Sequence, residues 1–90
     1  PNKVVGMVFT REGKMVENAI IEIQDKNGNA VRALRTNRLG QFETATPLSK
    51  GEYLVTVEKE GYDFDILKIE AKGEVLEPLI IKTKNGKGNG

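Results

Sequence analysis

The sequence predicts an all-β fold, a sandwich of about seven short strands. Apolar residues recur at every second position along the chain, and no segment has the spacing of an amphipathic helix. Turn residues such as glycine and asparagine return about every 8 to 12 positions, which is typical of an antiparallel sandwich. With 90 residues, the chain is long enough for one domain with one core.

The first three strands are expected at 4–10, 19–24 and 31–36. Apolar side chains dominate "VVGMVFT" and follow a small residue in "AIIEIQ". The pair Asn27-Gly28 lies between the second and third strands and predicts a type I′ hairpin turn, because both central residues of that turn need positive φ. The run "VRALRT" would then be the return strand of this hairpin.

The remaining strands are expected at 41–45, 52–60, 65–71 and 79–83. A turn at "NRLG" precedes the first of them, and a loop with Pro47 separates it from the next. The segment "EYLVTVEKE" has the most regular alternation in the chain, and "DILKIEA" and "LIIKT" follow the same period.

The alternation also predicts which side chains fill the core. One face of each strand is expected to point inward, as in any sheet that buries one side. The residues expected inside are Val8, Ala19, Ile21, Ile23, Leu34, Phe42, Leu48, Tyr53, Val55, Val57, Ile69, Leu79 and Ile81.

The composition excludes several classes of function. Fourteen lysines and arginines against thirteen acidic residues leave a net charge of +1, which gives no electrostatic reason to bind nucleic acid or an anionic membrane. Cysteine and histidine are both absent, so the usual thiolate, imidazole and metal-ligand chemistry is missing. No apolar run approaches the roughly 18 residues that cross a bilayer. We therefore expect a non-enzymatic chain with no cofactor, no metal, no nucleic-acid partner and no direct membrane insertion.

From the two ends of the sequence we expect a module of a longer protein. The chain starts with "PNKVV", without an initiator methionine, and closes with the glycine-rich "KNGKGNG". We expect one β-sandwich domain over residues 1–84 and a flexible tail or linker over residues 85–90.

Two stretches resemble a carboxypeptidase regulatory-like domain. "GMVFTREGKMVENAIIEI" is similar to the opening of that family, and "TNRLGQFETATPLSKGEYLVTVEKEGY" to its second half. The resemblance implies a seven-stranded Greek-key sandwich of the prealbumin-like (transthyretin-like) or immunoglobulin-like kind. It also implies an extracytoplasmic or cell-surface module of a bacterial protein, or a domain accessory to a carboxypeptidase. Residues in register with the family are Thr36, Asn37 (where aspartate is usual), Gly40, Phe42, Gly51, Tyr53, Gly61 and Tyr62.

Glu58 raises the one catalytic hypothesis. The stretch around it is also similar, more distantly, to collagen-adhesin B-type domains, in which a buried glutamate promotes a lysine–asparagine cross-link. Glu58 has the matching offset from Tyr53, and Asn85 could supply the amide. However, Val8 occupies the position of the required lysine, and Lys3 lies on the opposite face of the strand. We therefore interpret Glu58 as a solvated charge at the end of a strand.

The segment around Asn27 has a weak likeness to a calcium loop. Asp25, Asn27 and Asn29 alternate as ligands do in such a loop. The glycine and the glutamate that complete it are replaced by Ala30 and Thr36. Turn chemistry explains the stretch without a metal ion.

Two further groups of charged residues are interpreted as surface features. Asp63 and Asp65 share one face of a strand, where paired carboxylates could do acid–base work but are as well explained by solvent exposure. Arg32 and Arg35 differ in parity, so they are expected to point to opposite faces and to form no basic patch.

The candidate interaction surface consists of Tyr62, Phe64, Ile20 and Ile80. Tyr62 and Phe64 share a parity and either close one end of the core or form an aromatic platform for a sugar or a protein. Ile20 and Ile80 each belong to an adjacent isoleucine pair that could expose an apolar patch. The expected function is a structural or protein-interaction module that contacts neighbouring domains or another protein. The alternative is a carbohydrate-binding or enzyme-accessory domain.

Overall fold

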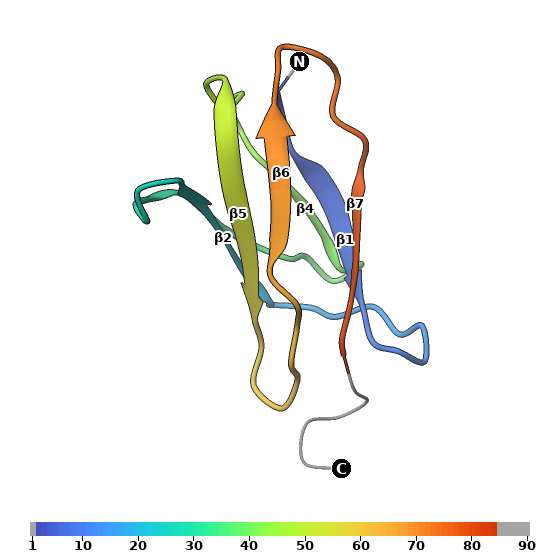
Figure 1. The fold of residues 1–90 in the computed structure, drawn as a ribbon. Coiled ribbons are helices and arrows are strands. Elements are labelled where there is room, and N and C mark those ends of the chain that lie inside the picture. The colour runs from blue at the N-terminus through green and yellow to red at the C-terminus, as the bar shows by residue number, and fades with distance from the viewer. Residues whose placement is uncertain (1, 85–90) are drawn as a thin grey trace.

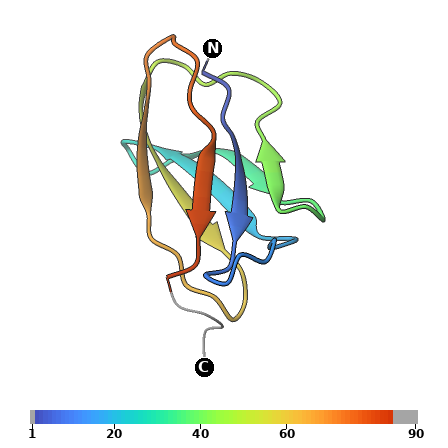
Figure 2. The same cartoon turned by 90° about the vertical axis from the view of Figure 1, so that its right-hand side faces the viewer.

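The computed structural model describes residues 2–84, in which the chain forms two β-sheets packed against each other and no helix (Figures 1 and 2). The all-β, two-layer sandwich expected from the sequence is confirmed. Each observed strand begins and ends within two residues of a range expected from the sequence. The strands are β1 (Val5–Phe9), β2 (Ile20–Asp25), β3 (Ala30–Arg35), β4 (Gln41–Glu43), β5 (Gly51–Glu58), β6 (Leu67–Ala71) and β7 (Leu79–Lys82).

The two sheets differ in size and in the direction of their strands. The three-stranded sheet has the order β4-β1-β7, and the four-stranded sheet has the order β3-β2-β5-β6. All pairs in the four-stranded sheet are antiparallel, whereas β1 pairs with β4 antiparallel and with β7 parallel. The first and last strands of the fold therefore lie side by side and run in the same direction (Figure 2).

The core lies between the sheets and contains the side chains that the alternation predicts. All thirteen residues expected inside are either buried or packed against the buried cluster. Three buried hydrophobic residues were not anticipated: Val16 in the loop after β1, Val4 just before β1, and the small Ala71 at the end of β6. Val4 shares the parity of Val8, so strand periodicity alone could have identified it.

Gly6 makes the close packing of the three-stranded sheet possible. A Cβ atom at this position would lie 2.5 Å from the carbonyl oxygen of Leu79 and 2.5 Å from Cζ of Phe42. Gly6 pairs in register with Leu79 on β7 and with Phe42 on β4. Because glycine has no Cβ, the Phe42 ring can cover the middle of β1 from the inside while β7 approaches from the side.

The chain reverses direction three times through the same five-residue turn: Thr10–Lys14, Asp25–Asn29 and Asn37–Gln41. In each, the first residue's N–H donates to the fifth residue's carbonyl, and the amide of a glycine at the fourth position donates back to the first residue's carbonyl. The glycine has positive φ, and a side-chain oxygen of the first residue accepts a hydrogen bond from the fifth residue's N–H. Threonine, aspartate and asparagine all suit the first position because each has a short side chain with an acceptor oxygen.

The prediction of a type I′ turn at Asn27-Gly28 is wrong. Only Gly28 has positive φ, at 87°, and Asn27 does not. The carboxylate of Asp25 accepts hydrogen bonds from the N–H groups of both Asn27 and Asn29, and these bonds favour a longer turn with a single left-handed residue at glycine. The sequence rule identified the hairpin but not the capping effect of the residue two positions earlier.

Candidate functional site

Three of the four predicted surface residues meet in a shallow groove at one end of the four-stranded sheet. Ile20 begins β2 and pairs in register with Glu58 at the end of β5 and with Arg35 at the end of β3. A turn after β5 brings the chain back, with the Tyr62 N–H donating to the Lys59 carbonyl at 3.1 Å. We call this region the Tyr62 groove; among its lining residues are Ile20, Arg35, Val57, Glu58, Tyr62 and Phe64.

The two aromatic residues of the Tyr62 groove have different roles. Both are half-buried, but Phe64 packs against the buried core, whereas Tyr62 lies outside that set of packed hydrophobic residues. Phe64 therefore plugs the end of the sandwich, as one of the two sequence interpretations supposed, and Tyr62 is the ring that a ligand could reach. The charges that line the groove are mixed, with Lys59 and Arg35 beside the acidic residues Glu58, Glu60 and Asp63.

The fourth predicted residue, Ile80, lies on the other sheet. It is 57% exposed on β7, and its register partner on β1 is Met7. The two side chains, together with Val5 and Pro78, line a second groove on the outer face of the three-stranded sheet, which we call the Ile80 groove. Sequence reasoning missed Met7 and Val5, although they alternate with the inward-pointing Val8 and so had to face outward.

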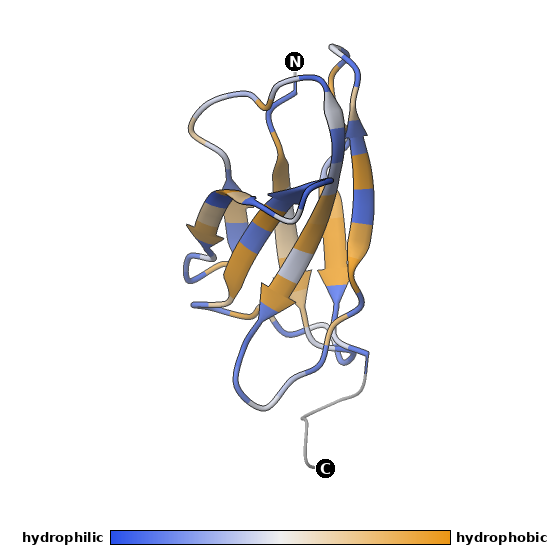
Figure 3. Cartoon of the chain, turned by 60° about the vertical axis from the view of Figure 1, so that its left-hand side comes forward, coloured by the Kyte–Doolittle hydropathy of each residue, from blue (hydrophilic) through white to orange (hydrophobic). Residues whose placement is uncertain are grey.

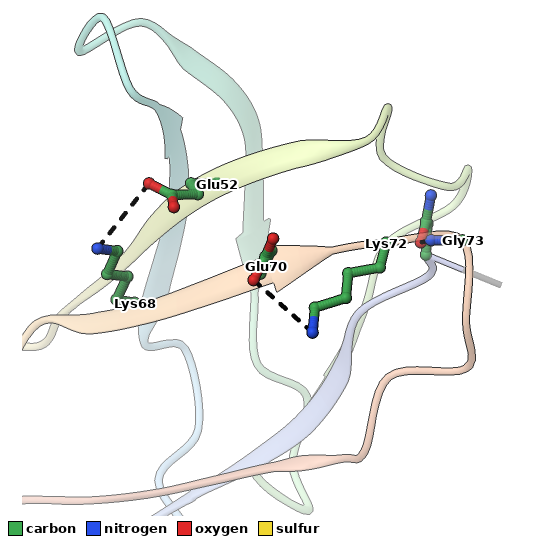
Figure 4. A network of polar contacts seen from close by, with 6 residues as sticks. Glu52, Lys68, Glu70, Lys72 and Gly73 are labelled. Atoms are coloured by element: carbon green, nitrogen blue, oxygen red, sulfur yellow. Dashed lines mark hydrogen bonds and ion pairs between the residues drawn. The ribbon is translucent and has the colours of Figure 1, made fainter.

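The outer face of the four-stranded sheet is polar by contrast. Glu52 on β5 forms an ion pair with Lys68 on β6 at 3.9 Å, and Glu70 forms one with Lys72 at 3.9 Å (Figure 4). Along these strands hydrophilic and hydrophobic residues alternate, as Figure 3 shows by the bands of colour. Leu54, at 38% exposed, is the one large apolar residue of β5 that is exposed. On the outer face of the three-stranded sheet the exposed Ile80 lies beside the half-buried Val5 and Met7, whereas the exposed Leu54 and Ile66 lie on or next to strands of the four-stranded sheet.

The surroundings of Glu58 differ from those that a catalytic glutamate of a cross-linking domain needs. Its side chain is exposed at the end of β5, whereas that chemistry requires a desolvated carboxyl group that exchanges protons with both partners. Val8, at the position of the missing lysine, is completely buried in β1. Asn85, the proposed amide donor, is outside the residues that the structure describes.

Asp25 uses its carboxylate to close a turn. Hydrogen bonds from the backbone N–H of Asn29 and then of Asn27 hold the pKa of this carboxyl group below its ordinary value. The side-chain amide of Asn29 also donates to it, at 3.4 Å. In residues 2–84, no three acidic side chains gather closely enough to hold a metal ion. The likeness to a calcium loop thus corresponds to a hydrogen-bonded turn.

The remaining charged candidates make structural contacts. The carbonyl of Asp63 accepts from the Lys84 N–H at 2.8 Å, and the Asp65 carboxylate lies 3.7 Å from Nζ of Lys84. Arg32 reaches from β3 across the edge of the sandwich, where Nη2 donates to the Thr46 hydroxyl at 3.0 Å and to the Pro47 carbonyl at 2.9 Å.

The two arginines of β3 point in opposite directions, as their parity predicts. Arg35 lies near both grooves, while Arg32 turns toward the loop after β4. The contact of Arg32 with the loop after β4 could not be predicted from the spacing of residues in the sequence.

Within the described part of the chain, no helix is long and apolar enough to cross a lipid bilayer.

Comparison with known proteins finds a relative for most of the chain. No protein-family model matches the chain. The chain is similar to carboxypeptidase M of Mus musculus, with 32% identity over 71 residues. The matched region is 79% of this chain but 15% of that protein, so the chain corresponds to a small part of the relative. This similarity is consistent with a carboxypeptidase regulatory-like domain.

Proposed function

We propose that the chain is a non-catalytic structural or protein-interaction module of a larger bacterial protein that is membrane-anchored, exposed at the surface or secreted. Its fold would be a seven-stranded Greek-key sandwich of the prealbumin-like kind, as in carboxypeptidase regulatory-like domains. The similarity to a short region of a much longer protein supports a modular role. Hydrogen-bonded roles for Asp25 and Arg32, and solvent exposure of Glu58, leave these side chains without a catalytic assignment.

The observation that carries the proposal is the Ile80 groove on the outer face of the three-stranded sheet, where apolar side chains lie beside Arg35 and Glu43. Ile80 and Met7 are register partners there, and the Ile80 groove continues to Val5 and Pro78. A contiguous apolar patch beside polar residues is typical of a surface that contacts another protein or a neighbouring domain. On the opposite outer face, exposed Leu54 lies on the same strand as Glu52, which forms an ion pair with Lys68.

Cysteine labelling tests this assignment. The chain contains no cysteine, so Ile80→Cys and the matched control Leu54→Cys each introduce a single thiol, on opposite outer faces. In the isolated chain both thiols should react quickly with a soluble maleimide. In the parent protein Ile80→Cys should be protected while Leu54→Cys is not. Equal reactivity of the two thiols in the parent protein would count against the Ile80 groove as an interface.

The alternative is a carbohydrate-binding accessory domain, favoured by the partly exposed ring of Tyr62 beside Ile20. An aromatic ring at the edge of a shallow polar groove can stack on a sugar. Only two tyrosines are present, and Tyr53 is buried with its hydroxyl donating to the Ser49 carbonyl at 2.6 Å. Tyrosine fluorescence that changes on addition of a glycan, and no longer does so in Tyr62→Ala, would support this role. If no glycan in a screen changes the tyrosine fluorescence, the carbohydrate-binding alternative is contradicted and the structural role remains.

A further inference from the structure

The first and last strands of the module form a parallel pair. The register runs from Gly6 opposite Leu79 to Phe9 opposite Lys82, with four paired positions. The chain therefore enters this pair at the start of β1 and leaves it at the end of β7, which lie at opposite ends of the ladder. A pull on the two ends of the chain would slide β1 and β7 past each other in opposite directions.

We propose that the module bears mechanical tension within its parent chain, with the β1–β7 pair acting as a shear clamp. The hydrogen bonds of a parallel ladder connect the strands across the direction of such a pull. Sliding loads all of them at once, whereas peeling one strand from its end breaks them one after another. Tension along the chain therefore meets the four paired positions together.

The clamp continues beyond the end of the ladder at β7, and the segment before β1 is bonded to the loop between β6 and β7. After β7, the Thr83 N–H donates to the Phe9 carbonyl at 3.0 Å, and the Thr83 hydroxyl accepts from the Arg11 N–H at 3.0 Å. Before β1, the side-chain oxygen of Asn2 accepts from the Gly73 N–H at 2.8 Å. Asn2 and Thr83 are both buried, so water competes poorly for these bonds.

Apolar side chains shield the ladder from water on its inner side. Val8 and its register partner Ile81 are both buried in the core, and Leu79 packs against the same cluster. Because sliding the strands would also pull these side chains out of the core, the hydrophobic contacts resist the same displacement as the hydrogen bonds. On the outer side, Met7 and Ile80 pair across the two strands.

Force spectroscopy on the 90-residue chain in two geometries tests the clamp. In the first geometry the handles are attached at the two chain ends. In the second they are attached at the C-terminus and at Glu12→Cys, an exposed position in the turn after β1, so that the load peels β7 from the end of β1. At one loading rate we expect the end-to-end unfolding force to be about three- to fourfold higher, because four paired positions share the load instead of one. Equal forces in the two geometries would overturn the proposal.

A matched pair of core variants separates the clamp from general stability. Val8 in β1 and Val55 in β5 are both completely buried, so Val8→Ala and Val55→Ala remove the same atoms from the same core. Both should weaken the chain against urea. Val8→Ala alone should clearly lower the end-to-end unfolding force, whereas Val55→Ala should leave it nearly unchanged. Equal losses of force in both variants would also overturn the clamp.

The clamp rests on the proposed structural role, but the two can fail separately. A module with equal forces in both geometries can still protect Ile80→Cys in its parent protein, and would then be an interaction domain that carries no load. A module with the expected force difference but an exposed Ile80→Cys would be a load-bearing spacer without that interface.

Discussion

The turns Asp25–Asn29 and Asn37–Gln41 have the same hydrogen bonds in different surroundings. In both, a side-chain oxygen of the first residue accepts from the third and fifth N–H groups, all four distances being 2.9 Å. A Cβ on Gly28 would meet nothing within 4 Å, whereas a Cβ on Gly40 would lie 2.7 Å from the Val8 carbonyl oxygen. Local sequence thus specifies the shape of a turn, and the rest of the fold decides what a change in that turn costs.

The largest loss of stability is expected at Gly40, the fourth position of the turn Asn37–Gln41. Gly40 has φ of 74°, and its carbonyl accepts a hydrogen bond from the Val8 N–H at 2.8 Å. Gly40→Ala should lower the free energy of unfolding by about 2–4 kcal/mol, because left-handed strain adds to a clash with β1. Urea unfolding followed by circular dichroism measures this loss.

The equivalent change in the turn Asp25–Asn29 should lower the free energy of unfolding by less. Gly28→Ala introduces the same left-handed strain, at φ of 87°, into open space. We expect a loss of about 1 kcal/mol in urea unfolding, since alanine also restricts the unfolded chain. Losses of equal size in Gly28→Ala and Gly40→Ala would show that the contact with β1 has no energetic weight.

The two turns also differ in their response to acid. Hydrogen bonds from Asn29 and Asn27 lower the pKa of Asp25, so its carboxylate contributes stability above the ordinary pKa of an aspartate. This contribution is lost as the pH falls through the lower pKa of the folded state. Asp25→Asn should therefore unfold with less dependence on pH between about 2 and 5 than the wild type, in thermal melts across that range.

The reciprocal substitution is the control for this pH effect. Asn37 accepts the same two backbone hydrogen bonds with a neutral amide, so its turn contributes no titration. Asn37→Asp should introduce an additional loss of stability toward acid. A pH profile that is the same in the wild type, Asp25→Asn and Asn37→Asp would contradict the role assigned to the carboxylate.

The smallest effects are expected at the third position of each turn. Asn27 and Leu39 each donate a backbone N–H to the first residue, and both side chains are exposed. Asn27→Ala and Leu39→Ala should each remain within about 0.5 kcal/mol of the wild type in urea unfolding. A larger loss of stability in Leu39→Ala would reveal that this side chain, which is 51% exposed, makes a contact that the hydrogen bonds of the turn Asn37–Gln41 do not include.

The candidate site was only partly accessible to sequence reasoning. Alternation predicted that Ile20 and Ile80 would be available on the surface, and the spacing of Tyr62 and Phe64 suggested one shared location. The spacing gave no indication that Ile20 joins the aromatic pair while Ile80 lies on the other sheet beside Met7. Strand order determines these neighbours, and the order depends on contacts between residues far apart in the chain. The expected linker at 85–90 lies outside the described residues and stays a prediction.

The sequence by itself determined the strands, their inward faces and the glycine turns. Each of these depends on residues within a few positions of one another, through alternation and through hydrogen bonds that close inside five residues. Only the tertiary structure decided that β1 and β7 pair in parallel, that Arg32 reaches Pro47, and that Gly40 is crowded where Gly28 is free. Those features arise when the two sheets pack, because packing brings together backbone and side chains whose separation in the chain carries no local signal.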